Sequence, residues 1–554
     1  MNNPIKLNEN KTIPVKTFSQ VGESLNAEVN LEYGKPPRIS LFLDSFTDDL
    51  IVQPIVADYF NEYCLSSFYE NKSRYSALFK YLYIGNADRE NIKKVYFTVP
   101  ELSAYFHREL NYKLDDDVNI SGNLRIEPLI SRIDKLGLSI KIHQGYNLKS
   151  YEDNTGFSFK NIIYFSYESD SKLSFLDIEN YMYKTIALLT WITGYPISVD
   201  SIEVSDGEKL GYLYLPLVKK LNTYDLSFPK SFMQLFLLRD NFQTICNNFF
   251  EKKELFTDIW SRTLPLFDFT GVLEYEVMLF TSILDKYFSS QVKNHKDNKI
   301  ENYESYLIKI GGFLKDNNQL KELLMDTKLL ENIKLNELRK VFPENNIQSF
   351  LSKQKAYFKI FNSEDLKIFL FKNDFKTIIS IRDNAAHGSR EELTTEEVLK
   401  YSWKVKLLTM YLIYKDLGVK NDEFFKIISN TFHPIVLNCE MNEELLDIKT
   451  GKSIYIKLSM IERDKMNSYN TRIKVFNKND NVYLFDYLLS QKASNYFSQD
   501  INYSFDPARF YSYEKYIQYL IDEEGLDKKA KHYSSVYLKN NDSKVLVNDV
   551  IIIY

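Results

Sequence analysis

Three residues that can handle a phosphate and a proton lie together around position 385. They are Arg382, Asp383 and His387, in the run Arg-Asp-Asn-Ala-Ala-His. A histidine gives or takes a proton near neutral pH, and a fixed cation stabilises the negative charge of a five-coordinate phosphorus. An arginine beside a histidine is therefore suited to phosphodiester transfer. Because the spacing alone is a weak signal, the elements that position these side chains decide its weight.

The motif falls at the end of a predicted helix, just before Gly388. In helical register, Arg382 shares one stripe with Phe375, Ile378, Ile379 and Ala386. A buried guanidinium is costly unless a carboxylate or a phosphate pairs with it. His387 lies four residues after Asp383, within side-chain reach, and the dipole at the last turn favours its imidazolium form. A second interpretation stays open, in which Arg382 pairs with an acid inside the protein and His387 merely caps the helix.

The region around the motif, residues 229–420, has helical periodicity. Apolar residues recur at steps of three and four in two segments. The first holds Leu273, Val277, Phe280, Leu284 and Tyr287, and the second holds Val398, Tyr401, Val405, Leu408 and Leu412. Thr394 and Glu397 offer a capping box at the start of the second helix. Further helices are predicted at 306–314, 319–341 and 365–386, with an exposed loop at 292–305. Long amphipathic helices with short connections predict an antiparallel bundle.

The region before it, residues 1–228, is predicted to be rich in strands. Apolar and polar residues alternate from 25 to 33 and again from 39 to 43, and the Gly-Lys-Pro-Pro run at 34–37 breaks the pattern between them. This arrangement predicts a hairpin. Further strands are predicted at 138–142, where His143 is expected on the surface, and at 162–167. A single helix is predicted from Ile178 to Thr193, because Gly194 and Pro196 follow it.

After residue 420 the pattern changes again. The segments 453–458 and 547–554 predict strands, and 511–521 predicts a helix. The predicted fold is therefore an α+β multidomain chain. It has a strand-rich N-terminal domain (1–228), an all-α helical bundle (229–420) and a small mixed α/β C-terminal appendage (421–554).

Composition and charge exclude several classes of protein. The net charge of −5 over 554 residues gives no global basic field, so any contact with RNA is expected to be local. The three cysteines, Cys64, Cys246 and Cys439, lie too far apart for a disulfide framework or a zinc knuckle. The N-terminus has no apolar signal region and no apolar run approaches the length of a membrane span. We expect a cytoplasmic protein with no membrane contact.

Four stretches resemble two known families. The run RDNAAHGS (382–389) looks like the R-x4–6-H motif of the HEPN superfamily. The segment 279–288 resembles the first HEPN helix, and Leu284-Asp285 stands where that family usually has Leu-Glu. Upstream, residues 177–197 and 228–266 are similar to ApeA-type anti-phage defence proteins. The resemblance covers roughly residues 20–420 and does not reach the C-terminal appendage.

The resemblance implies an endoribonuclease that stops phage by cutting RNA and arresting growth. In the implied mechanism the ribose 2′-hydroxyl attacks the neighbouring phosphate and leaves a cyclic phosphate and a 5′-hydroxyl. His387 would be the acid or base, Arg382 would hold the phosphate, Asp383 would orient one of them, and Asp285 would support the site. HEPN domains pair so that two motifs form one site, so a homodimer or larger even oligomer through the bundle is expected.

Residues 1–228 carry no catalytic constellation of their own, which leaves sensing, with a possible phage-derived trigger, as their expected role. No cofactor or metal is expected, because no acids or His-Cys cluster at ligand spacing accompany Arg382 and His387. The alternative is a non-catalytic HEPN module in which the same residues bind a nucleotide or a partner protein. A third possibility is a purely structural interaction protein.

Overall fold

The described part of the chain forms two compact units. The computed structural model describes residues 7, 10–18, 24–32, 34–41, 56–57, 62–63, 70–71, 76–78, 81–106, 111–114, 120–123, 126–150, 157–216, 226, 229–292, 350–360, 364–387, 393–480, 482–498, 512–539 and 544–554. The first unit spans residues 1–364 and 372–440, and the second spans 365–371 and 441–554. The domain boundaries predicted after residues 228 and 420 remain predictions.

The largest element of the first unit is a seven-stranded antiparallel sheet, ordered β12-β13-β14-β9-β15-β16-β8. Its strands are β8 (Leu82–Gly85), β9 (Lys94–Thr98), β12 (Leu129–Ile133), β13 (Leu138–Ser150), β14 (Phe157–Ser169), β15 (Ser201–Ser205) and β16 (Leu210–Tyr214). Leu138, Ile140 and Ile142 are buried on one face of β13, which confirms that predicted strand. The next side chain, His143, was predicted on the surface and lies outside this buried set. It is half-buried and lies 3.1 Å from the Ser166 hydroxyl.

A second sheet in this unit has the order β1-β2-β3-β7-β6. Its strands are β1 (Lys11–Phe18), β2 (Ser24–Leu31), β3 (Arg38–Leu41), β6 (Glu70–Asn71) and β7 (Ser76–Leu78). β2 and β3 pair antiparallel with Val29 opposite Ile39, so the predicted hairpin is confirmed. Two short ladders complete the strands, β4 (Val56–Ala57) with β5 (Glu62–Tyr63) and β10 (Asn111–Leu114) with β11 (Ile120–Asn123).

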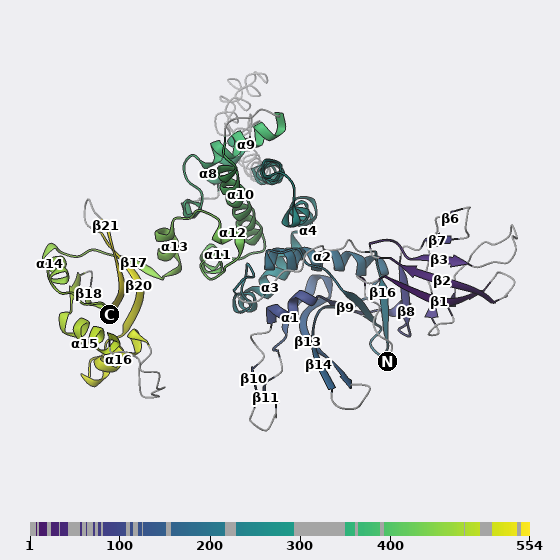
Figure 1. The fold of residues 1–554 in the computed structure, drawn as a ribbon, viewed down its shortest axis with the longest axis horizontal. Helices are drawn as coiled ribbons and strands as arrows, with labels where there is room; N and C mark the ends of the chain where they lie inside the picture. Colours follow the sequence, from purple (N-terminus) through teal and green to yellow (C-terminus); the bar gives the residue numbers. More distant parts are fainter. Residues whose placement is uncertain are drawn as a thin grey trace, which may run out of the picture. The chain divides into compact units, whose positions relative to one another are not determined.

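Helices α1 (Pro100–Phe106) and α2 (Phe175–Thr193) accompany the large sheet (Figure 1). Tyr181 of α2 stacks on Tyr167 of β14 with ring centroids 4.6 Å apart, which ties α2 to the sheet. The predicted helix is confirmed and starts three residues earlier, because Ser174 and Asp177 form a capping box. It ends at Gly194, whose φ of 77° suits a residue without a Cβ.

The helical part of the first unit follows in sequence. Its elements are α3 (Leu235–Glu251), α4 (Lys253–Asp258), η4 (Trp260–Asp268), a helix at 273–292, α8 (Phe350–Ile360), α9 (Asp374–His387), α10 (Thr395–Asp416), α11 (Asn421–Ile428) and α12 (Pro434–Leu437). The Thr394/Glu397 capping box is confirmed, as are the helices at 273–287 and 398–412. The predicted helices at 306–314 and 319–341, and the loop at 292–305 beyond Val292, lie outside the described residues.

One predicted helix, 365–386, was too long. Residues 364–368 form a 3₁₀ turn, and α9 begins only at Asp374. The physical reason is tertiary: residues 365–371 pack with the second unit, where Ile368 accepts a backbone hydrogen bond from Asn442 at 2.6 Å. Local helical periodicity does not report such long-range packing.

The strand-rich and helical parts of the first unit share a core. The Tyr414 hydroxyl of α10 donates to the carbonyls of Trp191 and Ile192 at the end of α2, at 3.1 Å each. The indole of Trp191 donates to the Thr263 hydroxyl at 3.0 Å. Trp191 and Tyr414 are both fully buried. The end of α2 is therefore fixed to α10 through buried hydrogen bonds.

The second unit is built on a mixed five-stranded sheet, ordered β17-β20-β21-β18-β19. Its strands are β17 (Ser453–Ile456), β18 (Lys474–Asn479), β19 (Val482–Phe485), β20 (Ala530–Lys539) and β21 (Lys544–Ile553), and its helices are α13 (Glu443–Thr450), α14 (Met460–Ser468), α15 (Tyr487–Ser498) and α16 (Tyr513–Glu523). Successive residues of β21, from Val550 to Ile553, enter two separate cores, so apolar side chains cover both faces. The predicted strands and helix of this region are confirmed. Among the described residues, no helix combines the length and apolar character that a membrane span requires.

Candidate functional site

The three motif residues lie in the last turns of α9. Asp383 and His387 are exposed, four residues apart and so on one face. Arg382 is half-buried. Arg382 and His387 are five positions apart, which places them about 140° apart around the helix axis. A single copy of α9 therefore presents Asp383 and His387 together and presents Arg382 toward a different side.

Arg382 lies against an aromatic ring. Its guanidinium carbon is 5.8 Å from the centroid of the Phe350 ring, and Phe350, the first residue of α8, is buried. A cation over a ring face is stabilised by about 0.5–1 kcal/mol when exposed and more when desolvated. Within the described residues no carboxylate forms an ion pair with Arg382. Among the described residues, the Phe350 ring is the contact that the structure gives for this guanidinium.

The predicted stripe of α9 is right in part. Phe375 and Ile378 are buried, whereas Ile379 is half-buried and Ala386 is exposed. Ile381, which the stripe omits, is buried. The apolar face of α9 is therefore rotated from the predicted one, and Arg382 lies at its border.

The first turn of α9 is fixed by a buried ion pair that the sequence analysis missed. The Lys404 ammonium of α10 lies 2.7 Å from Asp374 and 3.1 Å from Glu440, and the Lys404 side chain is fully buried. Lys400 also pairs with Glu440, and its hydrogen bond lowers the pKa of that carboxyl. The sequence does hold a sign of this ion pair, because Lys404 lies among the apolar residues Tyr401, Val405 and Leu408 on one face of its helix.

Asp285, predicted to support the site, pairs with α8. Both of its carboxylate oxygens lie 3.1 Å from the Lys353 ammonium, and the two side chains are 27% and 20% exposed. Lys353 lies three residues after Phe350, and Phe288 packs on Phe350 with ring centroids 5.8 Å apart. Asp285 thus helps to fix the helix that carries the ring beneath Arg382. The contacts that the structure describes for the Asp285 carboxylate join it to α8.

A second buried acid lies at the other end of α10. Asp416 accepts from the Trp260 indole at 2.8 Å and from the Tyr287 hydroxyl at 3.4 Å. Burial raises the pKa of Asp416 to about 6, against the opposing effect of these hydrogen bonds. Asp416 therefore accepts hydrogen bonds from the uncharged side chains of Trp260 and Tyr287, whereas Asp374 is paired with the cationic side chain of Lys404.

Comparison with known proteins bears on the N-terminal region. Residues 60–249 match the model of ApeA N-terminal domain 1, a span that includes the seven-stranded sheet, α2 and most of α3. No curated protein and no solved structure shows a significant match to the chain. The match supports the resemblance to ApeA-like anti-phage proteins over this region, and residues 382–387 lie outside it.

Proposed function

We propose that this chain is a metal-independent endoribonuclease of the HEPN type that acts in anti-phage defence. The observation that carries the proposal is Arg382, held half-buried on the Phe350 ring beside the exposed Asp383 and His387 at the end of α9. The ApeA-type match at 60–249 supports the defence role. The motif supports the chemistry.

The proposed reaction is attack by a ribose 2′-hydroxyl on the adjacent phosphorus. One base takes the proton of that hydroxyl, and an acid gives a proton to the departing 5′-oxygen. His387 fills one of these two roles, and Arg382 donates hydrogen bonds to the phosphate oxygens as charge builds on them. The products are a 2′,3′-cyclic phosphate and a 5′-hydroxyl. Asp383, one turn before His387, orients the imidazole or the guanidinium.

The placement of Arg382 and His387 favours a site made by two chains. Because they lie about 140° apart around α9, one phosphate is not readily reached by both from a single helix. A second copy of α9, related by a two-fold axis, would bring its own pair opposite the first. The proposed enzyme is therefore a dimer or a larger even oligomer.

The test is to incubate the purified full-length protein with total RNA, with and without excess EDTA, and to sequence the fragment ends. We expect defined cuts in both samples, with 2′,3′-cyclic phosphate and 5′-hydroxyl ends. Cutting that requires magnesium and leaves 5′-phosphates would overturn the mechanism. Intact RNA that nevertheless binds the protein would favour the alternative, a non-catalytic HEPN module that binds a nucleotide or a partner.

A further inference from the structure

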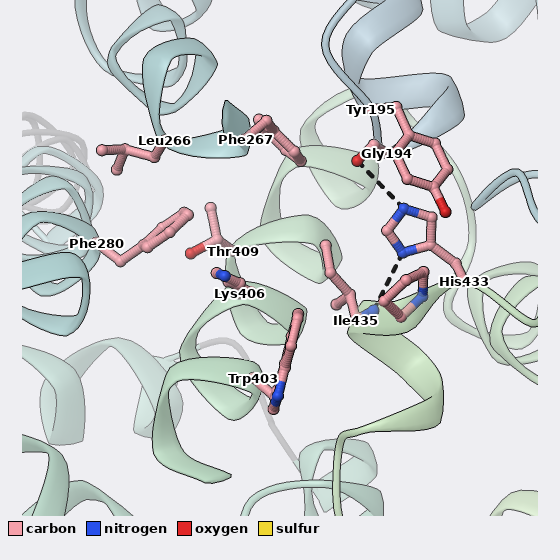
Figure 2. A pocket seen from close by; sticks show the side chains of 11 residues that line it. Gly194, Tyr195, Leu266, Phe267, Phe280, Trp403, Lys406, Thr409, His433 and Ile435 are labelled. Atoms are coloured by element: carbon pink, nitrogen blue, oxygen red, sulfur yellow. Dashed lines mark hydrogen bonds between the residues drawn. The ribbon is translucent and has the colours of Figure 1, made fainter. Parts of the chain in front are cut away.

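A cavity of about 120 Å³ lies where the end of α2 meets the helical part of the first unit (Figure 2). Its lining comes from residues just after α2, from η4, from the helix at 273–292, from α10 and from α12. Lys404, which carries the contact to α9, lies two residues before the cavity residue Lys406 and so nearly opposite it on α10. The cavity is therefore separate from the Arg382 motif.

The walls of the cavity are mainly aromatic. The rings of Tyr195, Phe267, Phe280 and Trp403 line it, together with the His433 imidazole. Figure 2 shows the Phe280 and Trp403 rings on the same side as Thr409 and Lys406 of α10. An apolar cavity of about 150 Å³ in another protein takes up benzene, so the present volume of about 120 Å³ is of the order that one six-membered ring needs. Ring faces at the walls favour a flat ligand.

The ammonium group of Lys406 determines which ligand charge the cavity can accept. The Lys406 ammonium lies 2.7 Å from Glu276 and 4.4 Å from the centroid of the Trp403 ring. The Glu276 side chain is only 4% exposed and also accepts a hydrogen bond from Ser402. An anionic ligand would compete with a buried carboxylate for Lys406, and a cationic ligand would be repelled by Lys406. An ammonium has three N–H donors, so an uncharged ligand with an acceptor oxygen can bind without breaking the ion pair.

His433 closes the cavity as a neutral wall. Its Nδ1 accepts from the Ile435 backbone N–H at 3.2 Å, so Nε2 carries the hydrogen and donates to the Gly194 carbonyl at 3.2 Å (Figure 2). The imidazole also packs on the Tyr195 ring, with centroids 4.4 Å apart. Burial lowers the pKa of His433 to about 3, so the ring stays uncharged at neutral pH. His433 therefore joins the segment after α2 to α12 and holds Tyr195 in the wall.

We infer that this cavity binds a small, uncharged, planar ring of pyrimidine size, with a ring carbonyl that accepts a hydrogen bond from Lys406. Such a ligand contacts Tyr195, in the region that matches the ApeA N-terminal domain, and Trp403, in the helix that anchors α9. Its binding therefore stabilises the packing of the strand-rich part on the helical part. This inference does not depend on RNA cleavage.

The first experiment compares three probes on the full-length protein by saturation-transfer NMR and by tryptophan fluorescence. Uracil is uncharged and carries ring carbonyls, orotate is the same ring with a carboxylate, and benzene has no acceptor. Of the three tryptophans, Trp191 and Trp260 are fully buried and Trp403 is half-buried, so quenching by a bound ring reports on Trp403. We expect uracil to bind at least about tenfold more tightly than either other probe, the effect of one lost or opposed hydrogen bond. Absence of uracil binding, or equal or tighter binding of orotate or benzene, would overturn the inference.

The second experiment tests whether uracil binds in this cavity. Thr409→Leu adds side-chain atoms to the cavity wall and should abolish uracil binding. Lys406→Met combined with Glu276→Gln, which avoids leaving a buried carboxylate unpaired, should weaken uracil about tenfold and leave benzene unchanged. Leu399→Ala, at an exposed position of α10, is the matched control. Melting curves verify that each variant is folded. Uracil binding unchanged in folded Thr409→Leu would refute the site, and the three-probe comparison on the unmodified protein decides the ligand class if that variant does not fold.

Discussion

The two ends of α9 differ in how they are held. At the first turn, Asp374 is buried and paired with a fully buried lysine of α10, Lys404. At the last turn, Asp383 and His387 face solvent and Arg382 lies on a single aromatic ring. The two ends of one helix therefore differ: a buried ion pair fixes the first turn, and the last turns leave polar side chains exposed to solvent.

The largest effect should come from the exposed end. His387→Ala removes the proposed acid or base, and general acid–base groups typically contribute about 10²–10⁴-fold, so RNA cleavage should fall by that factor. The melting temperature should stay unchanged because the side chain is exposed. Lys376→Ala, at another exposed position of α9, is the control and should retain full activity. Full cleavage by His387→Ala would remove this residue from the mechanism.

The next effect should come from the buried end. Lys404→Met leaves Asp374 buried without its cation, which typically costs about 3–5 kcal/mol of unfolding free energy. The variant should also lose RNA cleavage in proportion to any loosening of α9. Denaturant titration measures the first effect. The double variant Lys404→Met/Asp374→Leu should recover much of the stability, since no unpaired buried charge remains: Glu440 is half-exposed and keeps its pair with Lys400. A loss that is no smaller in the double variant would show that the ion pair is not what fixes this end.

These two ends also show what the sequence could predict. Periodicity and caps predicted α2, α10, the β2/β3 hairpin and the helix that carries Arg382, because these are local patterns. The ring beneath Arg382 comes from Phe350, 32 positions earlier, and no local pattern marks that contact. The segment 365–371 reads as helix and packs with the second unit instead. The sequence shows Lys404 as a charged residue on an apolar helix face. Its partners, Asp374 and Glu440, come from separate segments of the chain, so local patterns do not identify them.

A third effect follows from comparing the two buried acids of this region. Asp374 has a cation, whereas Asp416 receives hydrogen bonds from Trp260 and Tyr287 and its pKa is raised to about 6. The folded protein therefore holds the Asp416 proton at pH values where the unfolded chain has released it. Its stabilising contribution is full below about pH 4 and is lost as the pH rises through about 6, by at most about 3 kcal/mol.

Asp416→Asn should remove that pH dependence, because an amide does not titrate. Unfolding free energies measured between pH 4 and 7 should fall for the unmodified protein relative to the variant as the pH rises. Asp383→Asn, a change at an exposed acid, is the control and should leave the slope unaltered. Parallel curves for Asp416→Asn and the unmodified protein would contradict the assignment of this proton to Asp416.

The smallest effect should come from the ring that supports Arg382. Phe350→Leu keeps an apolar side chain in the core and removes the ring face, a contact of about 0.5–1 kcal/mol at such a half-exposed cation. Arg382 would then sample more rotamers, and the concentration of RNA needed for half-maximal cleavage should rise by about threefold, while the protonation step at His387 is untouched. Phe358→Leu is the matched control. It lies in the same helix and removes the same atoms, and its ring packs on Phe288 and Phe375, the two rings that Phe350 also contacts. Phe358 is half-buried where Phe350 is buried, so Phe358→Leu should lose somewhat less stability in a thermal melt, and only Phe350→Leu should weaken RNA binding. If the two variants weakened binding equally, the effect would come from core packing, and the Phe350 ring would have no specific part in holding Arg382.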